Sequence, residues 1–157
     1  MCSRFEQLDL TYKNIVMDSK DFQFEIIMII DDTEVDRYTA SYVIRKQNFA
    51  REILQFSMAT KAIKYLEENR YNTALLPQLI LLDLNMPEMD GLQFLERLSQ
   101  LPECVNYSCC IVMLSSSLNP ADRQRAEENP AVKQFLNKPL QKEDLQVINK
   151  FYLDAVT

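Results

Sequence analysis

The sequence contains no histidine, and Gly91 is its only glycine. Without histidine, the chain alone cannot build a Ser-His-Asp or Cys-His catalytic site or a histidine-ligated zinc centre. A single glycine excludes the two common glycine-rich nucleotide cradles, GxGxxG and GxxxxGK[ST]. Chemistry in this chain must therefore use carboxylates, hydroxyls and lysines.

Basic charge and long apolar runs are also scarce. The 17 Lys and Arg residues face 23 Asp and Glu residues, which gives a formal net charge of −6. This balance disfavours a nucleic-acid-binding surface, because the phosphate backbone rewards a basic face. The apolar runs, such as residues 26–30, are too short to span a bilayer, and residues 1–6 do not begin a signal peptide. We therefore expect a cytoplasmic protein that neither inserts into a membrane nor binds nucleic acid directly.

The rest of the composition is that of one soluble globular domain. Hydrophobic residues make up 47% of the 157 positions and charged residues make up 25%. The cysteines form no CxxC pair, and Cys109 and Cys110 open an apolar run. We expect these cysteines to be small buried side chains rather than a disulfide or a functional thiol.

Short apolar runs alternate with amphipathic stretches from about residue 25 onward. Five such strand–helix units predict an α/β domain with a parallel sheet covered by helices on both faces. In the first helix, Val35, Tyr38, Tyr42 and Val43 have the spacing of one apolar face. Asn119 and Pro120 predict the N-cap and first residue of a later helix. The predicted strands are residues 26–30, 52–56, 79–82, 111–114 and 132–136.

Residues 1–24 do not follow this alternation. Their apolar positions have the spacing of one short amphipathic helix, which the polar run at residues 18–21 would end. We therefore expect an N-terminal extension over residues 1–24 and a single domain over residues 25–157.

Polar residues follow four of the predicted strands. Asp31 and Asp32 follow the first strand, and Asp83 follows the third. Ser115 follows the fourth strand, and Lys138 follows the fifth. In a parallel sheet the carboxyl ends of the strands share one edge, so these side chains should converge.

Each of these residues alone has an ordinary explanation as a helix cap, a turn residue or a solvated charge. Together they are harder to explain structurally, because three neighbouring carboxylates repel unless a cation neutralises them. Mg²⁺ suits such a site, since it prefers oxygen ligands and shares its octahedron with water and phosphate oxygens. A lysine and a hydroxyl nearby could bind the oxygens of a transferred phosphoryl group.

In this order and spacing, the residues resemble the receiver domain of two-component response regulators. The resemblance covers residues 25–157 and implies a flavodoxin-like, doubly wound sheet of five parallel strands in the order 2-1-3-4-5. It also implies a stand-alone signalling module rather than an enzyme. The motifs that carry it are Asp31-Asp32, Asp83-Leu84-Asn85-Met86-Pro87 with Asp90-Gly91, Ser115, and Lys138-Pro139.

The resemblance assigns a role to each acidic residue. Asp83 would accept a phosphoryl group from a sensor histidine kinase or a histidine phosphotransfer protein. Asp31, Asp32 and Asp83 would ligate Mg²⁺, with Asp31 acting directly or through water. The backbone carbonyl of Asn85 would complete the protein's share of the ligands.

The remaining roles concern the response to phosphorylation. Ser115 would bind a phosphoryl oxygen, and Lys138, ahead of a cis peptide bond, would pair with the phosphoryl group or with Asp83. Phe135 would be the switch aromatic that moves inward as Ser115 does. Residues 119–156 would form the face that binds a downstream protein, and phosphorylation could also promote a homodimer.

The sequence departs from the family at a few positions. Residues 127–131 lack the usual small-residue turn before the fifth strand, Phe135 replaces a more familiar Tyr, and Ser115 replaces Thr. Two alternatives stay open: an interaction module that is never phosphorylated, and a phosphatase with an aspartyl nucleophile. The phosphatase is disfavoured, because in such haloacid-dehalogenase-like enzymes a second Asp lies two residues after the nucleophile, whereas Asp31 and Asp32 are adjacent.

Overall fold

The computed structural model describes residues 22–101 and 109–156. Strands and helices alternate along the chain, with one short 3₁₀ helix before the third strand. None of the described helices is long and apolar enough to cross a membrane. The elements are β1 (Phe24–Ile30), α2 (Glu34–Lys46), β2 (Ala50–Phe56), α3 (Ala59–Asn69), η1 (Thr73–Leu75), β3 (Leu79–Asp83), α4 (Gly91–Ser99), β4 (Cys110–Ser115), α6 (Pro120–Glu127), β5 (Val132–Asn137) and α7 (Lys142–Val156).

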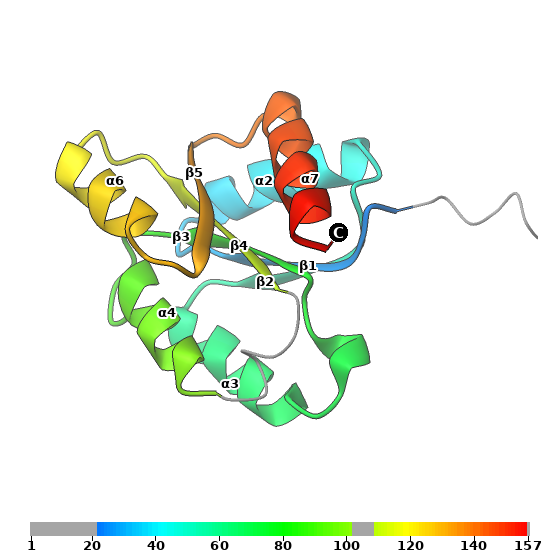
Figure 1. Ribbon diagram of the computed structural model, residues 1–157, viewed down its shortest axis with the longest axis horizontal. Coiled ribbons are helices and arrows are strands. Elements are labelled where there is room, and N and C mark those ends of the chain that lie inside the picture. The colour runs from blue at the N-terminus through cyan, green and yellow to red at the C-terminus, as the bar shows by residue number, and fades with distance from the viewer. Residues whose placement is uncertain (1–21, 102–108, 157) are drawn as a thin grey trace, which may run out of the picture.

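The strands form one parallel sheet in the order β2-β1-β3-β4-β5 (Figure 1). The central strands β3 and β4 are buried along their whole length, whereas the edge strands β2 and β5 contain exposed and half-buried residues. Continuous apolar runs therefore mark the strands that helices cover on both faces. The predicted doubly wound, flavodoxin-like fold is confirmed, with all five predicted strands in place.

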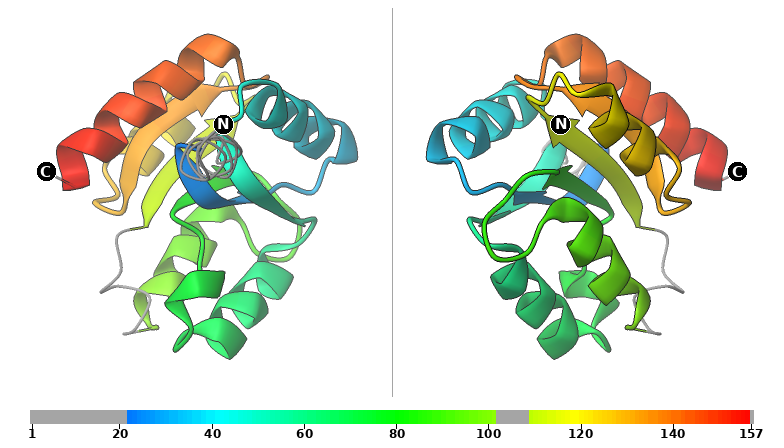
Figure 2. Two further views of the ribbon diagram at one scale, coloured as in Figure 1. Left: turned by 90° about the vertical axis from the view of Figure 1, so that its right-hand side faces the viewer. Right: turned by 90° about the vertical axis from the view of Figure 1, so that its left-hand side faces the viewer.

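Helices cover both faces of the sheet, as the edge-on views make clear (Figure 2). Buried side chains of α2 and α7 pack with one face, and those of α3, α4 and α6 pack with the other. The sheet thus separates two hydrophobic cores. The carboxyl ends of β1, β3 and β4 emerge between them along one edge.

The first helix corrects one expectation. Val35, Tyr38 and Tyr42 are 69%, 68% and 53% exposed, so the face they form does not pack on the sheet. The buried face of α2 consists instead of small or aliphatic residues, including Ala40 and Ile44. Val43, the fourth residue of the predicted face, does pack against the core, so the apolar spacing located the helix correctly but placed most of its apolar residues on the wrong side.

Two helix starts follow their sequence signals. Asn119 caps α6 by accepting a hydrogen bond from the Ala121 N–H, with Pro120 as the first helical residue, as predicted. Asp90 caps α4 in a complete capping box: its carboxylate accepts the Gln93 N–H, and the Gln93 side chain accepts the Asp90 N–H.

The expected N-terminal extension lies almost wholly outside the described residues. β1 begins at Phe24, the last residue of that extension, and its ring contacts the rings of Phe49 and Tyr152. Cys2 and Cys104 also lie outside the described part of the chain. Cys110 is buried, as expected, and Cys109 is half-buried.

Candidate functional site

Asp31 follows directly on the last residue of β1, where the backbone fixes its direction. The Asp31 Oδ1 atom accepts a hydrogen bond from the Thr33 N–H at 2.8 Å. The guanidinium of Arg37 donates to the Asp31 backbone carbonyl at 2.7 Å. Asp31 is buried, whereas its neighbour Asp32 is exposed at the rim. The carboxyl end of β1 therefore carries one buried and one solvent-accessible carboxylate.

Asp83 is the last residue of β3, the strand beside β1. Ile30 pairs with Leu82, so the chain brings Asp31 and Asp83 side by side one residue further along. The Asn85 N–H hydrogen-bonds the Asp83 carboxylate.

Gly91 lets the loop after β3 return against its own strand. Its N–H donates to the Leu84 carbonyl at 2.8 Å. A Cβ atom at position 91 would lie 2.5 Å from the Asp83 carbonyl oxygen. Only glycine fits so close to this backbone, which explains why the single glycine of the chain lies here.

The carboxylates of Asp31, Asp32 and Asp83 form a compact acidic cluster. Each offers an oxygen, and the three oxygens lie within 4.8 Å of one another. Burial, and then the nearby charge of Asp31, raise the pKa of Asp83 to about 6, and burial also raises the pKa of Asp31. Because the ionised carboxylates are disfavoured here, a bound cation would stabilise their negative charge. Hard oxygen donors at this spacing fit a divalent ion such as Mg²⁺ or Mn²⁺.

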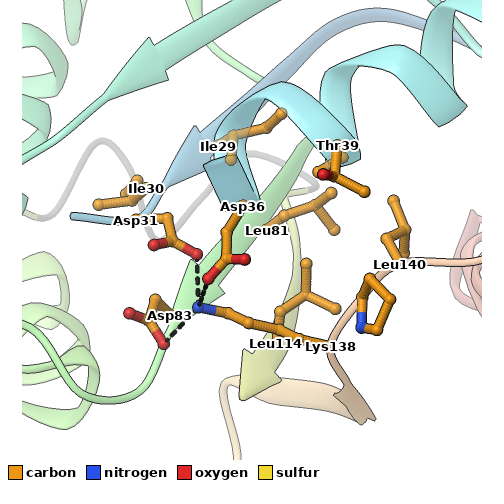
Figure 3. A pocket seen from close by; sticks show the side chains of 12 residues that line it. Ile29, Ile30, Asp31, Asp36, Thr39, Leu81, Asp83, Leu114, Lys138 and Leu140 are labelled. Atoms are coloured by element: carbon orange, nitrogen blue, oxygen red, sulfur yellow. Dashed lines mark hydrogen bonds and ion pairs between the residues drawn. The ribbon is translucent and has the colours of Figure 1, made fainter. Parts of the chain in front are cut away.

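Lys138 supplies a positive charge beside this cluster. Its side chain extends to the carboxylates from the loop after β5 (Figure 3). Its ammonium lies 2.6 Å from Asp31 Oδ2, 3.0 Å from Asp36 Oδ2 and 3.2 Å from Asp83 Oδ1. Burial alone would lower the pKa of Lys138, but hydrogen bonds to Asp31 and Asp36 raise it well above its ordinary value. Lys138 is therefore charged at neutral pH. The Lys138–Pro139 peptide bond is cis, as the resemblance implied.

Sequence reasoning missed Asp36. It lies in the first turn of α2, 102 residues before its partner Lys138. The pattern Thr33-x-x-Asp36 has the form of a helix capping box, so its only local signal indicated a structural role.

Ser115 ends β4 at the same edge, but its hydroxyl is occupied by its own loop. Ser115 is buried, and its Oγ accepts the Ser117 N–H at 3.0 Å. Ser117 Oγ in turn donates to Asp122 at 2.8 Å. Among the described residues, no hydrogen bond joins Ser115 to Asp83. The structure therefore places Ser115 at the predicted edge, with its described hydrogen bond to Ser117 and none to Asp83.

Phe135 lies in β5 with its side chain already in the core. It is 3% exposed, and the Arg123 guanidinium lies 5.3 Å from its ring centroid. The proposed switch aromatic is therefore packed inward in this structure, under a cation from α6.

A family model and a curated relative match most of the chain. The model of the response regulator receiver domain matches residues 27–149. The response regulator Rcp1 of Synechocystis sp. is 28% identical over 138 residues, which cover 85% of this chain and 92% of Rcp1.

Solved structures of similar sequence have the same architecture. A response regulator receiver protein from Dyadobacter fermentans is 32% identical, with a TM-score of 0.71 over 82% of this chain and 98% of that one. The Mn²⁺-bound form of Rcp1 is 28% identical, with a TM-score of 0.65 over 85% of this chain and 97% of that one.

Proposed function

The chain belongs to the response regulator receiver domain family of two-component signalling, and on that premise we propose that Asp83 is its phosphoryl acceptor. One observation carries the proposal: the buried Asp83 carboxylate ends a central strand within reach of two further carboxylates and the Lys138 ammonium. The family is a signalling module that works with histidine kinases or phosphotransfer proteins. A phosphohistidine of such a protein would be the donor.

The proposed transfer needs little nucleophilic strength from the protein. An oxygen of Asp83 bonds to phosphorus as the P–N bond of the phosphohistidine breaks, and the departing imidazole keeps the electron pair and takes up a proton. Lys138, 3.2 Å from Asp83, would pair with the phosphoryl oxygens. Such loose transition states depend on positioning and charge compensation, which these side chains supply.

Asp31, Asp32, Asp83 and the Asn85 carbonyl would hold Mg²⁺. When bound, this ion would neutralise charge on the carboxylates and on the transferring oxygens. Mn²⁺ in the solved form of Rcp1 is another hard divalent ion and supports a metal site of this class.

We further propose that phosphorylation changes the face made by α6, β5 and α7. The added charge of about −1.5 to −2 would draw Ser115 out of its contact with Ser117. Val147 and Phe151, which are 37% and 40% exposed on α7, give that face apolar area for a protein partner. Hydrogen exchange over residues 119–156, with and without a phosphodonor, tests this part of the proposal.

The acceptor is tested by intact-protein mass after incubation with acetyl phosphate, with Mg²⁺ or with EDTA. We expect the wild type to gain one phosphoryl group only with Mg²⁺, and Asp83→Asn to gain none. Asp154→Asn, an exposed aspartate at the far end of α7, is the matched control and should behave like wild type. No gain from acetyl phosphate or phosphoramidate would instead support an interaction module that is never phosphorylated.

A further inference from the structure

We propose that Asp36 is a positioning residue: its carboxylate keeps Lys138 at the site while Asp31 binds the metal ion and Asp83 accepts the phosphoryl group. The inference rests on the proposed function of Asp83, and it assigns a role to a carboxylate outside the acidic cluster of Asp31, Asp32 and Asp83.

The ammonium of Lys138 has three N–H donors, and three carboxylates surround it. The oxygens of Asp31, Asp36 and Asp83 lie 2.6, 3.0 and 3.2 Å from Nζ, and the lysine side chain is only 9% exposed. Figure 3 shows the three carboxylates converging on the nitrogen from β1, α2 and β3. Each donor therefore has one acceptor, and the direction of the ammonium is set jointly by these groups.

Two of the three acceptors have other tasks in the proposed reaction. Asp83 becomes an acyl phosphate, a mixed anhydride, and loses the charge on the oxygen that bonds to phosphorus. Asp31 would bind the divalent ion, while its Oδ1 already accepts the Thr33 N–H. Asp36 has no such second task, so it is the acceptor that can keep Lys138 at the site throughout.

An ordinary structural role for Asp36 would be a capping box at the start of α2, but the contacts do not form one. The Thr33 side chain makes no capping hydrogen bond, and the Thr33 N–H is taken by Asp31. Asp36 Oδ2 accepts a hydrogen bond from Lys138 instead. The start of α4, where Asp90 and Gln93 complete a capping box, shows the arrangement that α2 lacks. The carboxylate of Asp36 is thus directed to the lysine rather than to its own helix.

The test is a comparison of phosphorylation rates with acetyl phosphate at saturating Mg²⁺. Asp36→Asn keeps the size of the side chain and removes its charge, so we expect the rate to fall about tenfold as a charge-assisted hydrogen bond becomes a neutral one. Glu34→Gln removes the same charge from the same helical turn at an exposed position, and its rate should match wild type. Urea unfolding of both variants checks that each is folded.

A double-mutant cycle shows whether Asp36 acts through the lysine. In a Lys138→Met background, Asp36→Asn should change the remaining rate by no more than about twofold. An unchanged or faster rate for Asp36→Asn alone would overturn the inference. An equal loss in both backgrounds would also overturn it, because the effect would then not pass through Lys138.

A second measurement does not depend on phosphorylation. In the metal-free protein, the ¹⁵N-correlated signal of the Lys138 ammonium can be assigned by its loss in Lys138→Met. We expect Asp36→Asn to shift or broaden this signal and Glu34→Gln to leave it in place. If the wild type gains no phosphoryl group, the proposed function fails and this signal alone decides the role of Asp36; an unchanged signal overturns it.

Discussion

The site has an acidic half around Lys138 and a hydroxyl half around Ser115, and the two are built in different ways. In the acidic half, Asp31, Asp36 and Asp83 already meet at Lys138 through ion pairs of 2.6 to 3.2 Å. In the hydroxyl half, Ser115 and Ser117 bond within their own loop and to Asp122. The acidic half thus joins residues from four separate parts of the fold, whereas the hydroxyl half is held by hydrogen bonds between residues close in the sequence.

This difference indicates where the free energy of phosphorylation would be used. In the acidic half, the charged groups that would receive a cation or a phosphoryl group already lie side by side. In the hydroxyl half, Ser115 would leave its contact with the Ser117 N–H to reach a phosphoryl oxygen under the proposed function. A backbone hydrogen bond from the Lys138 N–H to the Ser115 carbonyl at 3.0 Å links the halves, beside the strand pairing of Asp83 with Leu114. Under the proposed function, the receiving part would stay near its present arrangement and the larger movement would fall in the responding part.

The largest effect should come from removing the cation of the acidic half. Lys138→Met leaves buried carboxylates without their partner, so in metal-free buffer the free energy of unfolding should fall by about 3 kcal/mol. Saturating Mg²⁺ should restore part of this loss, because the ion then supplies the missing charge. Urea unfolding with EDTA and with Mg²⁺ measures both effects.

The matched control for that variant is Lys142→Met, which changes an exposed lysine at the start of α7. Its unfolding free energy should stay within about 0.5 kcal/mol of wild type. If both lysine variants lost equal stability, the acidic half would not be the preassembled unit described above.

The next largest effect should come from substituting Gly91, which packs against the backbone of Asp83. Gly91→Ala places a Cβ atom 2.5 Å from the Asp83 carbonyl and 2.6 Å from Met113 Cε. The backbone at Asp83 must then shift, so we expect a loss of about 2 kcal/mol in unfolding free energy and weaker Mg²⁺ binding. Glu96→Ala, at an exposed position of the same helix, should change neither quantity. Wild-type metal affinity in Gly91→Ala would show that the close approach is not needed to place Asp83.

The pH dependence of metal binding tests the acidic half, because burial and the charge of Asp31 raise the pKa of Asp83 to about 6. The pKa of Asp83 is about 6 in the folded protein, above the value of about 3.9 for an unfolded chain. Protonated Asp83 therefore stabilises the metal-free fold below about pH 4, and that stabilisation is lost as the pH rises through about 6. The ion competes with this proton, so its apparent Kd should be about tenfold weaker at pH 5 than at pH 7.5.

Calorimetric titrations with Mg²⁺ between pH 5 and pH 7.5 measure this dependence. Asp83→Asn removes the competing carboxyl group and should flatten the pH profile while it weakens binding. A wild-type Kd that does not change with pH would contradict the raised pKa of Asp83.

Much of this architecture could be predicted from the sequence, because the signals were local. Apolar runs such as the one that ends β1 identify strands buried on both faces, and the polar residues after them lie at one edge of a parallel sheet. That rule located both Asp31 and Asp83. Gly91 entered only as part of a motif, and its close contact with the Asp83 carbonyl depends on how the loop folds back.

The features that were missed depend on distant parts of the chain. Asp36 meets Lys138 across 102 residues, and nothing next to Asp36 in the sequence indicates that partner. The face of α2 that carries Tyr38 and Tyr42 was predicted to be buried and is exposed. Their spacing shows that they share one face of a helix, but it does not show whether that face packs against the sheet. Which side is buried depends on packing against α7 and the sheet, where smaller residues such as Ala40 fit. Periodicity finds an element, but its orientation follows from what surrounds it.

The smallest effect should come from loosening the hydroxyl half. Ser117→Ala removes the hydroxyl that donates to Asp122 at 2.8 Å and accepts the Asn119 N–H at 3.2 Å. We expect a loss of about 1 kcal/mol in unfolding free energy and faster hydrogen exchange in residues 115–119. The Mg²⁺ Kd should remain that of wild type, because the acidic half does not depend on this loop. Ser116→Ala, at the exposed neighbouring position, is the control. Weaker Mg²⁺ binding in Ser117→Ala alone would mean that the halves are already coupled before phosphorylation, and that the movement is not confined to the responding part.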